Sequence, residues 1–344
     1  MDEQARTTSR ADTTQGSLFG EKAPASGRSP LVYSVSGGVD STAVIIESHR
    51  RGIRPDLQLF ADTGGEKPST YAYLRVLDRF CAEIGFPPII TVRYRVQRPV
   101  FGHYDTLEQE VLLHGKLPSL AYGSHTCSHK WKVSPQQAHI EGWEPARRAW
   151  RQGLPVIQMI GFDASPHDSR RCGRLPDDDP RYEFYTPLIE WSIDRAKAIE
   201  IIRDCELLAR IACEMGVDPV PEKSACFFCP ATKPEEVVAL AAAHPDLARR
   251  AMQIERNAAP NLTTTEGLFR KATKTRPGSW TELLTGEALP VAGPDAVDEI
   301  RDRRTAARAA AVCRAGQEVL FGRTDVGAAS ANASDQAAVS STVG

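Results

Sequence analysis

Long apolar stretches are missing from this 344-residue sequence. No run approaches the ~20 hydrophobic residues that cross a bilayer, which argues against a membrane-spanning chain. Residues 1–28 are polar and contain no apolar signal core, so we expect the protein to stay in the cytoplasm. The net charge of −2 is close to neutral and gives no general argument for a nucleic-acid partner.

Two common nucleotide-binding motifs are absent as well. No glycine is followed at the right spacing by the Gly-Lys-Ser/Thr of the usual P-loop, and no GxGxxG occurs. The chain also has no internal repeat. A nucleotide site in this protein would therefore need a different phosphate-binding loop.

Cysteine is present in eight copies. Because the sequence has no secretion signal, we expect free thiols rather than disulfides. Cys81, Cys205 and Cys213 fall in apolar helical patterns and are predicted to be core residues, and Cys313 is predicted to lie in a helix. A metal or cluster site is the alternative for a subset of the eight.

Short apolar runs alternate with helical patterns in the first half of the chain. The runs PLVYSV, LQLFAD, PIITVRY and PVIQMIGF are predicted strands, and helical spacing fills the gaps between the first three. This alternation predicts an α/β fold with a doubly wound parallel sheet. Ligands of such sheets bind beyond the carboxyl ends of the strands, where SGGVDS and DTGGEKP lie.

Composition divides the chain into four parts. Residues 29–190 are predicted to form the α/β nucleotide-binding domain, and residues 191–324 a mainly helical subdomain that contains a CxxC pair. Residues 1–28 and 325–344 are rich in small and polar residues and are predicted to be disordered tails.

Residues 36–42, SGGVDST, predict a phosphate cradle. Glycines let the chain turn sharply and point successive N–H groups at one anion, and the helix that follows adds its positive end. Ser36, Ser41 and Thr42 supply hydroxyl donors, and Asp40 suggests a bound Mg²⁺. The alternative is an ordinary strand-to-helix turn with a polar N-cap.

This segment resembles the PP-loop of the ATP pyrophosphatase superfamily, whose members split ATP into AMP and pyrophosphate. The resemblance implies an adenine nucleotide alpha hydrolase-like fold with ATP and Mg²⁺ as cofactors. The nucleotide-binding residues that it implies are Ser36, Gly37, Gly38, Val39, Asp40, Ser41, Thr42, Asp62, Thr63 and Gly161.

Five further segments resemble the phosphoadenosine phosphosulfate (PAPS) reductase family, in the order of that family. The resemblance implies catalytic roles for Asp40, Lys132 and Arg170. With the loop, the matching segments span residues 31–236, and they are FADTGGEKPSTYAYL, CSHKWKVSP, IGFDASPHDSRR, YTPLIEWS and SACFFCP.

Departures from that family favour a different branch. The reductases carry a catalytic cysteine in an ECGLH-like C-terminal tail, which this chain lacks, and they tend to have a degenerate loop, whereas SGGVDS is intact. Both features resemble the sulfur-inserting branches, such as DNA phosphorothioation enzymes and tRNA thiolases. The third segment also departs, with Phe162-Asp163 and Asp168-Ser169 in place of the usual arginine and Glu-Ser.

Three cysteines form a candidate metal site. Cys226 and Cys229 form a CxxC pair beside Pro230, and Cys127 lies in the segment SHTCSHKWKVSP. Thiolates are soft ligands that suit a [4Fe–4S] cluster, with zinc as the alternative. Cys172, in SRRCGR, is the candidate fourth ligand.

Basic segments that contain aromatic residues suggest a nucleic-acid acceptor. ARRAWRQG and DSRRCGR, with Lys130 and Lys132, form basic patches near Trp143 and Trp150. The alternatives are a solvated helix face with core tryptophans, or arginines that hold the triphosphate of ATP. The expected partners are ATP, a tRNA or DNA acceptor, a sulfur-donor protein such as a cysteine desulfurase, and a second copy in a homodimer.

The sequence thus predicts an enzyme that binds ATP, adenylates a substrate with release of pyrophosphate, and transfers sulfur to it with the help of a cysteine-ligated cluster. Two alternatives stay open. One is a reductase of PAPS or adenylyl sulfate, and the other is a non-catalytic nucleotide-binding subunit with a structural zinc.

Overall fold

The computed structural model describes residues 27–96 and 102–321. The predicted tails, residues 1–28 and 325–344, lie outside these ranges except for Gly27 and Arg28. No helix in the described ranges is long and apolar enough to cross a membrane.

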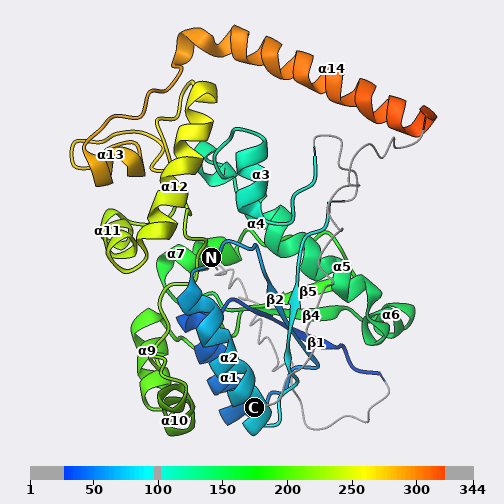
Figure 1. Cartoon of the computed structure of the whole chain (residues 1–344). Coiled ribbons are helices and arrows are strands. Elements are labelled where there is room, and N and C mark those ends of the chain that lie inside the picture. Colours follow the sequence, from blue (N-terminus) through cyan, green and yellow to red (C-terminus); the bar gives the residue numbers. More distant parts are fainter. Residues whose placement is uncertain (1–26, 97–101, 322–344) are drawn as a thin grey trace, which may run out of the picture.

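A parallel sheet of five strands forms the centre of the fold (Figure 1). The strand order is β3-β2-β1-β4-β5, and every neighbouring pair is parallel. The α/β fold and the four predicted strands are confirmed, whereas β5 was not predicted. The strands are β1 (Leu31–Val35), β2 (Leu57–Ala61), β3 (Ile89–Val92), β4 (Val156–Ile160) and β5 (Tyr182–Tyr185).

The strand order creates a switch point between β1 and β4. The chain builds β2 and β3 on one side of β1 and then returns to build β4 and β5 on the other side. The connections that leave β1 and β4 therefore diverge and open a crevice at the carboxyl ends of these strands. The loop at residues 36–38 follows β1 and Gly161 follows β4, so both lie at this crevice.

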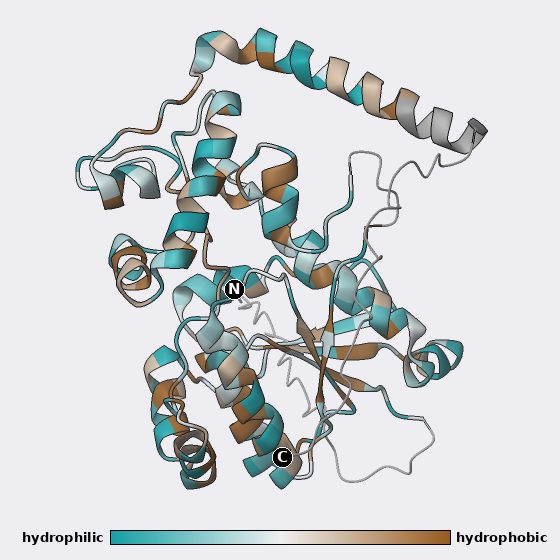
Figure 2. Ribbon diagram, in the orientation of Figure 1, coloured by the Kyte–Doolittle hydropathy of each residue, from teal (hydrophilic) through white to brown (hydrophobic). Residues whose placement is uncertain are grey.

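Helices cover both faces of the sheet, which is why its strands are apolar on both sides (Figure 2). Neighbouring residues of β1 point to opposite faces: Tyr33 packs in the cluster with α1, α2, α9 and α10, and Val32 packs in the cluster with α5 and α6. These helices are α1 (Val39–Arg50), α2 (Pro68–Glu83), α5 (Ser134–Gly142), α6 (Glu144–Arg151), α9 (Arg195–Arg203) and α10 (Glu206–Glu214).

A second apolar core joins residues 104–131 to residues 227–289. Trp131, Phe228 and Trp280 are fully buried within it. The segment 104–131 thus packs with much later helices, although it lies between β3 and β4 in the chain. The predicted division of the chain near residue 190 stays a prediction. The helices of this core are α3 (Leu107–Leu113), α11 (Pro234–Ala243), α12 (Pro245–Ala258) and α13 (Trp280–Thr285).

The remaining helices are short connections, apart from α14 (Val297–Phe321), a long helix along one side of the molecule (Figure 1). The short ones are η1 (Ser119–Tyr122), α4 (Thr126–Ser128), η2 (His129–Val133), α7 (Pro166–Cys172), α8 (Pro187–Glu190), η3 (Ala259–Asn261) and η4 (Pro294–Ala296).

All eight cysteines are free thiols, as predicted. Cys81 is buried in the core, and Cys205 is partly buried and packs against the same cluster. The prediction for Cys213 is wrong, because its side chain is exposed. Helix α10 turns Leu208 and Ile211 to the core, and Cys213 lies outside that buried stripe.

The basic segment ARRAWRQG lies far from the crevice in the fold. It forms α6, which ends just before β4 begins and therefore lies at the amino edge of the sheet. Trp143 and Trp150 pack against the apolar cluster under this helix, and Arg147 and Arg148 are exposed. This arrangement matches the alternative of a solvated helix face with core tryptophans.

Candidate functional site

The loop between β1 and α1 needs glycine at two positions for two different reasons. Gly37 has φ +73°, which is in the left-handed region that other residues avoid. Gly38 is the N-cap of α1, and a Cβ at this position would lie 2.9 Å from the Oγ of Ser224. The second glycine therefore lets a distant loop, two residues before Cys226, approach the backbone of this turn.

The hydroxyl groups after the glycines hold the turn together. Thr42 Oγ1 donates to the Gly38 carbonyl at 2.9 Å, and Ser41 Oγ donates to the same carbonyl at 3.0 Å. Ser41 and Thr42 are buried, whereas Ser36 is exposed. The side chain of Val39 packs in the core, so Val39 can meet a ligand through its backbone only.

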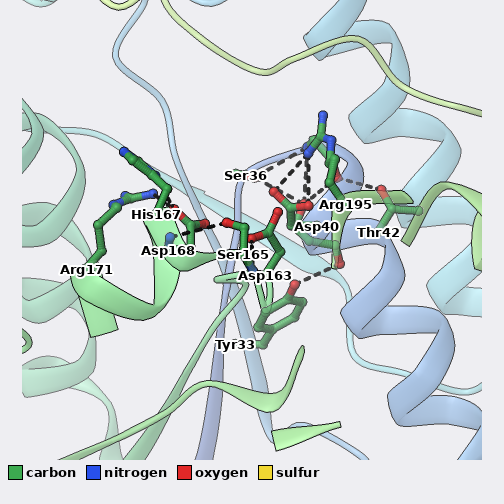
Figure 3. A network of polar contacts seen from close by, with 12 residues as sticks. Tyr33, Ser36, Asp40, Thr42, Asp163, Ser165, His167, Asp168, Arg171 and Arg195 are labelled. Carbon is green, nitrogen blue, oxygen red and sulfur yellow. Dashed lines mark hydrogen bonds and ion pairs between the residues drawn. The ribbon is translucent and has the colours of Figure 1, made fainter. Parts of the chain in front are cut away.

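Three carboxylates meet at the switch point (Figure 3). The oxygens of Asp40, Asp163 and Asp168 that could hold a metal ion all lie within 4.8 Å of one another. Asp40 is in the first turn of α1, Asp163 follows β4, and Asp168 is in the first turn of α7. Gly161 allows this approach, because a Cβ there would be 3.3 Å from the backbone of Asp40.

Arginines flank the three carboxylates on both sides (Figure 3). Arg195 Nη1 lies 2.9 Å from both oxygens of Asp40, and Arg171 Nη1 lies 2.9 Å from Asp168 Oδ1. Burial raises the pKa of Asp40, Arg195 opposes that shift, and the charges of Asp163 and Asp168 add to it. A cation between the carboxylates would therefore relieve a real electrostatic cost at Asp40.

The pKa of Asp168 moves the other way. Burial favours its neutral form, but hydrogen bonds from Arg171 and His167 outweigh burial and lower the pKa.

Arg170, a predicted catalytic residue, is exposed on α7, and Arg171 is the arginine that contacts a carboxylate. Arg195 was missed in the sequence, where it is one charged residue among many at a helix start.

Asp62, at the end of β2, organises its own loop. Only 2% of Asp62 is exposed. Its Oδ1 accepts hydrogen bonds from Gly64 N at 2.8 Å and from the Tyr71 hydroxyl at 2.7 Å, and its Oδ2 accepts from Arg93. The carboxylate is thus engaged by protein groups and shapes the segment that carries Thr63.

The CxxC loop docks on this segment. Phe227 N donates to the Gly65 carbonyl at 2.8 Å, and Glu66 pairs with Cys226 in an antiparallel bridge. The Sγ of Cys226 lies 3.2 Å from Thr63 Oγ1. The loops after β1 and β2 therefore both contact the segment from Ser224 to Cys226, which brings the cysteine pair next to the glycine loop.

The three predicted metal-binding cysteines are neighbours. Cys127 and Cys226 pack against the same apolar cluster, and the charge of Cys127 acts on Cys229. Burial raises the pKa of Cys226 and of Cys229 above the ordinary value, so these thiols need a cation to become thiolates. The Sγ of Cys172 lies 3.4 Å from Thr186 Oγ1, and the role of Cys172 as a fourth ligand stays a prediction.

Lys132 is the cation beside these thiols. It lies on the π-helix His129–Val133, a wide turn that often marks functional sites. Its Nζ donates to Glu66 Oε1 at 2.9 Å. Burial works against its charge, but Glu66, Cys226 and Cys229 outweigh burial and raise the pKa of Lys132.

Comparison with known proteins gives weak structural likeness and no match in sequence. No protein-family model and no curated protein matches the sequence. Among solved structures, the U34-tRNA thiolase NcsA from Methanococcus maripaludis with its [4Fe–4S] cluster is 13% identical, over 76% of this chain and 82% of that chain, with a TM-score of 0.31. These values are too low to carry a function from that protein to this one.

Proposed function

We propose that the protein is an ATP pyrophosphatase of the PP-loop type that adenylates an acceptor and transfers sulfur to it with a cysteine-held iron–sulfur cluster. The observation that carries the proposal is the adjacency of two sites. The loop that carries Ser224 and Cys226 touches the glycine loop at Gly38, and its Cys226 contacts Thr63. An activated acceptor and a sulfur source would therefore meet at one edge of the sheet.

We assign the phosphates of ATP and Mg²⁺ to the switch point between β1 and β4. The amino end of α1 supplies backbone N–H groups and a positive dipole end for phosphate. Asp40, Asp163 and Asp168 offer oxygen ligands, which Mg²⁺ prefers, and Asp163 and Asp168 are only 7% and 8% exposed. Arg195 pairs with Asp40 and would help to hold the leaving pyrophosphate.

The cysteines fit a cluster better than a single zinc ion. Thiolates around one zinc must lie about 3.8 Å apart, as a tetrahedron with bonds of about 2.3 Å requires. Among the described residues, the three carboxylates form a group whose ligand atoms lie within 4.8 Å of one another, and the three cysteines do not. Ligands at the corners of a cluster lie farther apart, and thiolates are its usual ligands.

The reaction then has two steps. An acceptor oxygen attacks the α-phosphorus of ATP, a new P–O bond forms, and the bond to pyrophosphate breaks. The amino end of α1 would stabilise the charge that develops on the pyrophosphate, and a Mg²⁺ held by Asp40, Asp163 and Asp168 would add a positive charge there. A sulfur nucleophile next attacks the activated acceptor and AMP leaves. When bound, the cluster would supply a position that can hold this sulfur, and its positive charge, with that of Lys132 added, would oppose burial and keep the cysteines as thiolates.

A basic cavity of about 860 Å³ supports a nucleic-acid acceptor. Lys130 lines it, only three residues after Cys127, and Arg304 and Arg308 reach it from α14. Glu110 also lines the cavity and pairs with Lys116 and Lys130, so one negative charge opposes the four cations there. Phosphates favour the remaining excess of positive charge, and the exposed ring of Tyr122 can stack on a base.

The test is pyrophosphate release from ATP under anaerobic conditions, with pooled tRNA or DNA as acceptor and sulfide as sulfur source. Asp40→Asn removes one of the three carboxylates, and we expect it to lower the rate at least 100-fold, about 3 kcal/mol. Asp246→Asn is the matched control, because Asp246 is an exposed carboxylate in the first turn of α12. Wild-type turnover by Asp40→Asn would contradict the proposal.

Two further measurements on the same protein separate the alternatives. Formation of sulfite from PAPS with a thiol donor and without ATP would identify a reductase. Tight ATP binding without pyrophosphate release on any acceptor, in a protein that holds zinc, would identify a non-catalytic subunit. The sulfur-donor protein and the homodimer stay predictions.

A further inference from the structure

Glu66 carries a buried carboxylate oxygen that has no partner. The side chain is fully buried, with 0% exposed. Its Oε1 accepts a hydrogen bond from Lys132, but its Oε2 has no hydrogen-bond partner. An unpaired buried carboxylate oxygen is costly, and nearly all such atoms in proteins are satisfied. A group that completes this site is therefore expected.

The direction of the Glu66 side chain indicates which groups surround its unpaired oxygen. Glu66 and Cys226 are directly opposed in an antiparallel bridge. Opposed residues project their side chains to the same side, with Cβ atoms about 5 Å apart. The charge of Glu66 acts on Cys226, and Lys132 is close to Glu66, Cys226 and Cys229 together. The orphaned oxygen thus lies among the cysteines of the candidate cluster site.

The available protein cation is already used on the other oxygen. Lys132 donates a hydrogen bond to Oε1 of Glu66, and neither oxygen of this carboxylate is exposed to solvent. Cys172, the candidate fourth ligand in the sequence, lies at the end of α7, where its Sγ is 3.4 Å from Thr186 Oγ1. A metal centre held by three thiolates still needs a fourth donor at its last position. Glu66 Oε2 is a buried oxygen that could serve as a metal ligand and has no hydrogen-bond partner.

We propose that Glu66 is the fourth protein ligand of the metal centre held by Cys127, Cys226 and Cys229, and that it binds through Oε2. The inference rests on the proposed function, which supplies the cluster as that centre. A carboxylate is a harder and weaker partner for iron in a sulfur-rich centre than a thiolate. The position that Glu66 occupies would therefore be the one that incoming sulfur can take.

The experiment uses the full chain with its cluster assembled anaerobically. The rate at which a chelator removes iron is measured together with the EPR spectrum of the reduced cluster. Glu66→Gln removes the charge and keeps the shape. Glu66→Asp keeps the pair with Lys132 but withdraws the oxygen, so it guards against misfolding of the first variant. Glu47→Gln is the matched control, because Glu47 is a buried carboxylate on α1 paired with Arg50.

We expect both Glu66 variants to lose one iron at least about tenfold faster than wild type and to show a changed EPR spectrum, with the control unchanged. Wild-type iron loss and an unchanged spectrum in both variants would overturn the assignment of Glu66 and leave the proposed function standing. A wild-type protein that assembles no cluster would overturn both. Pyrophosphate release is measured in parallel, because it reports on the proposed function alone.

Discussion

The substitution Gly64→Ala tests how the loop after β2 is fitted against α3. Gly64 has φ +69°, and a Cβ added there would lie 2.3 Å from Cγ2 and 2.7 Å from Cβ of Thr106. Thr106 cannot move freely, because it is the N-cap of α3 and accepts a hydrogen bond from Gln109 N at 3.1 Å. The substitution therefore meets two separate obstacles.

Each obstacle has its own size. The left-handed backbone costs an alanine about 1–2 kcal/mol. The overlap with Thr106 adds about 1–3 kcal/mol, as other overpacked sites do. We therefore expect Gly64→Ala to lower the free energy of unfolding by about 2–5 kcal/mol. Adding Thr106→Gly removes both overlapping atoms, costs only a few tenths of a kcal/mol at the cap, and should recover the overlap part.

The assay is urea denaturation followed by the fluorescence of the five tryptophans. Gly85→Ala is the matched control, because Gly85 has φ +75° and nothing lies within 4 Å of its added Cβ. The control should lose only the backbone part, about 1–2 kcal/mol. Equal losses in the two alanine variants, or no recovery in the double variant, would refute the packing of this loop against Thr106.

Two further predictions concern charged groups. Lys132→Met leaves Glu66 buried without its cation and should destabilise the metal-free protein by about 1–3 kcal/mol, less than for a fully buried pair because 36% of the Lys132 side chain is exposed. The double variant with Glu66→Gln should recover most of this loss in the same urea assay, and a strictly additive loss would contradict the pairing. Arg171 and His167 lower the pKa of Asp168 in the folded protein, so this carboxylate stabilises the fold above the unfolded pKa of about 3.9 and stops doing so as pH falls through the folded value. Asp168→Asn should therefore be less stable than wild type at pH 6, and the difference should shrink below about pH 4; a difference independent of pH would exclude this role.

The sequence was sufficient to predict four strands, including the edge strand β3, but not β5, the strand at the other edge. The runs of β1, β2 and β4 are apolar because these strands are covered on both faces. β5 is a short edge strand, YEFY, in which two of the four residues are only partly buried. YEFY places a glutamate among its aromatic residues and gives a weaker strand signal than IITV of β3, which is β-branched throughout. The pairing of β5 with β4 depends on the rest of the fold.

Some residues of the candidate site could also be predicted from the sequence, and others could not. The glycine loop could be predicted because its short pattern between a strand and a helix is visible in the sequence and the left-handed backbone at Gly37 is a local requirement, whereas the approach of Ser224 to Gly38 could not. Arg195 could not, because it is 155 residues from Asp40 and reaches that carboxylate only when α9 packs on α1. The role of Glu66 could not be predicted for a related reason. An oxygen without a hydrogen-bond partner is a property of the packed structure, and no sequence pattern indicates it.

Cys213 shows the limit of reading helices by composition. The segment is helical and apolar as predicted, but burial depends on which residues of the helix face the core. Leu208, Ile211 and Ala212 fix that face, and Cys213 lies beyond it. A cysteine in an apolar helical pattern is therefore a weaker sign of burial than a leucine at the same spacing.

The central claim is that three cysteines hold an iron–sulfur cluster beside the nucleotide site, and one measurement tests it directly. Iron, acid-labile sulfide and zinc are measured in protein purified anaerobically, as wild type, as Cys226→Ser and as Cys213→Ser. Cys213 is the matched control because it is an exposed thiol outside the site. The account predicts iron and sulfide in near equal amounts in wild type and in the control, and their loss in Cys226→Ser. Zinc alone, no metal, or a cluster that survives Cys226→Ser would contradict it.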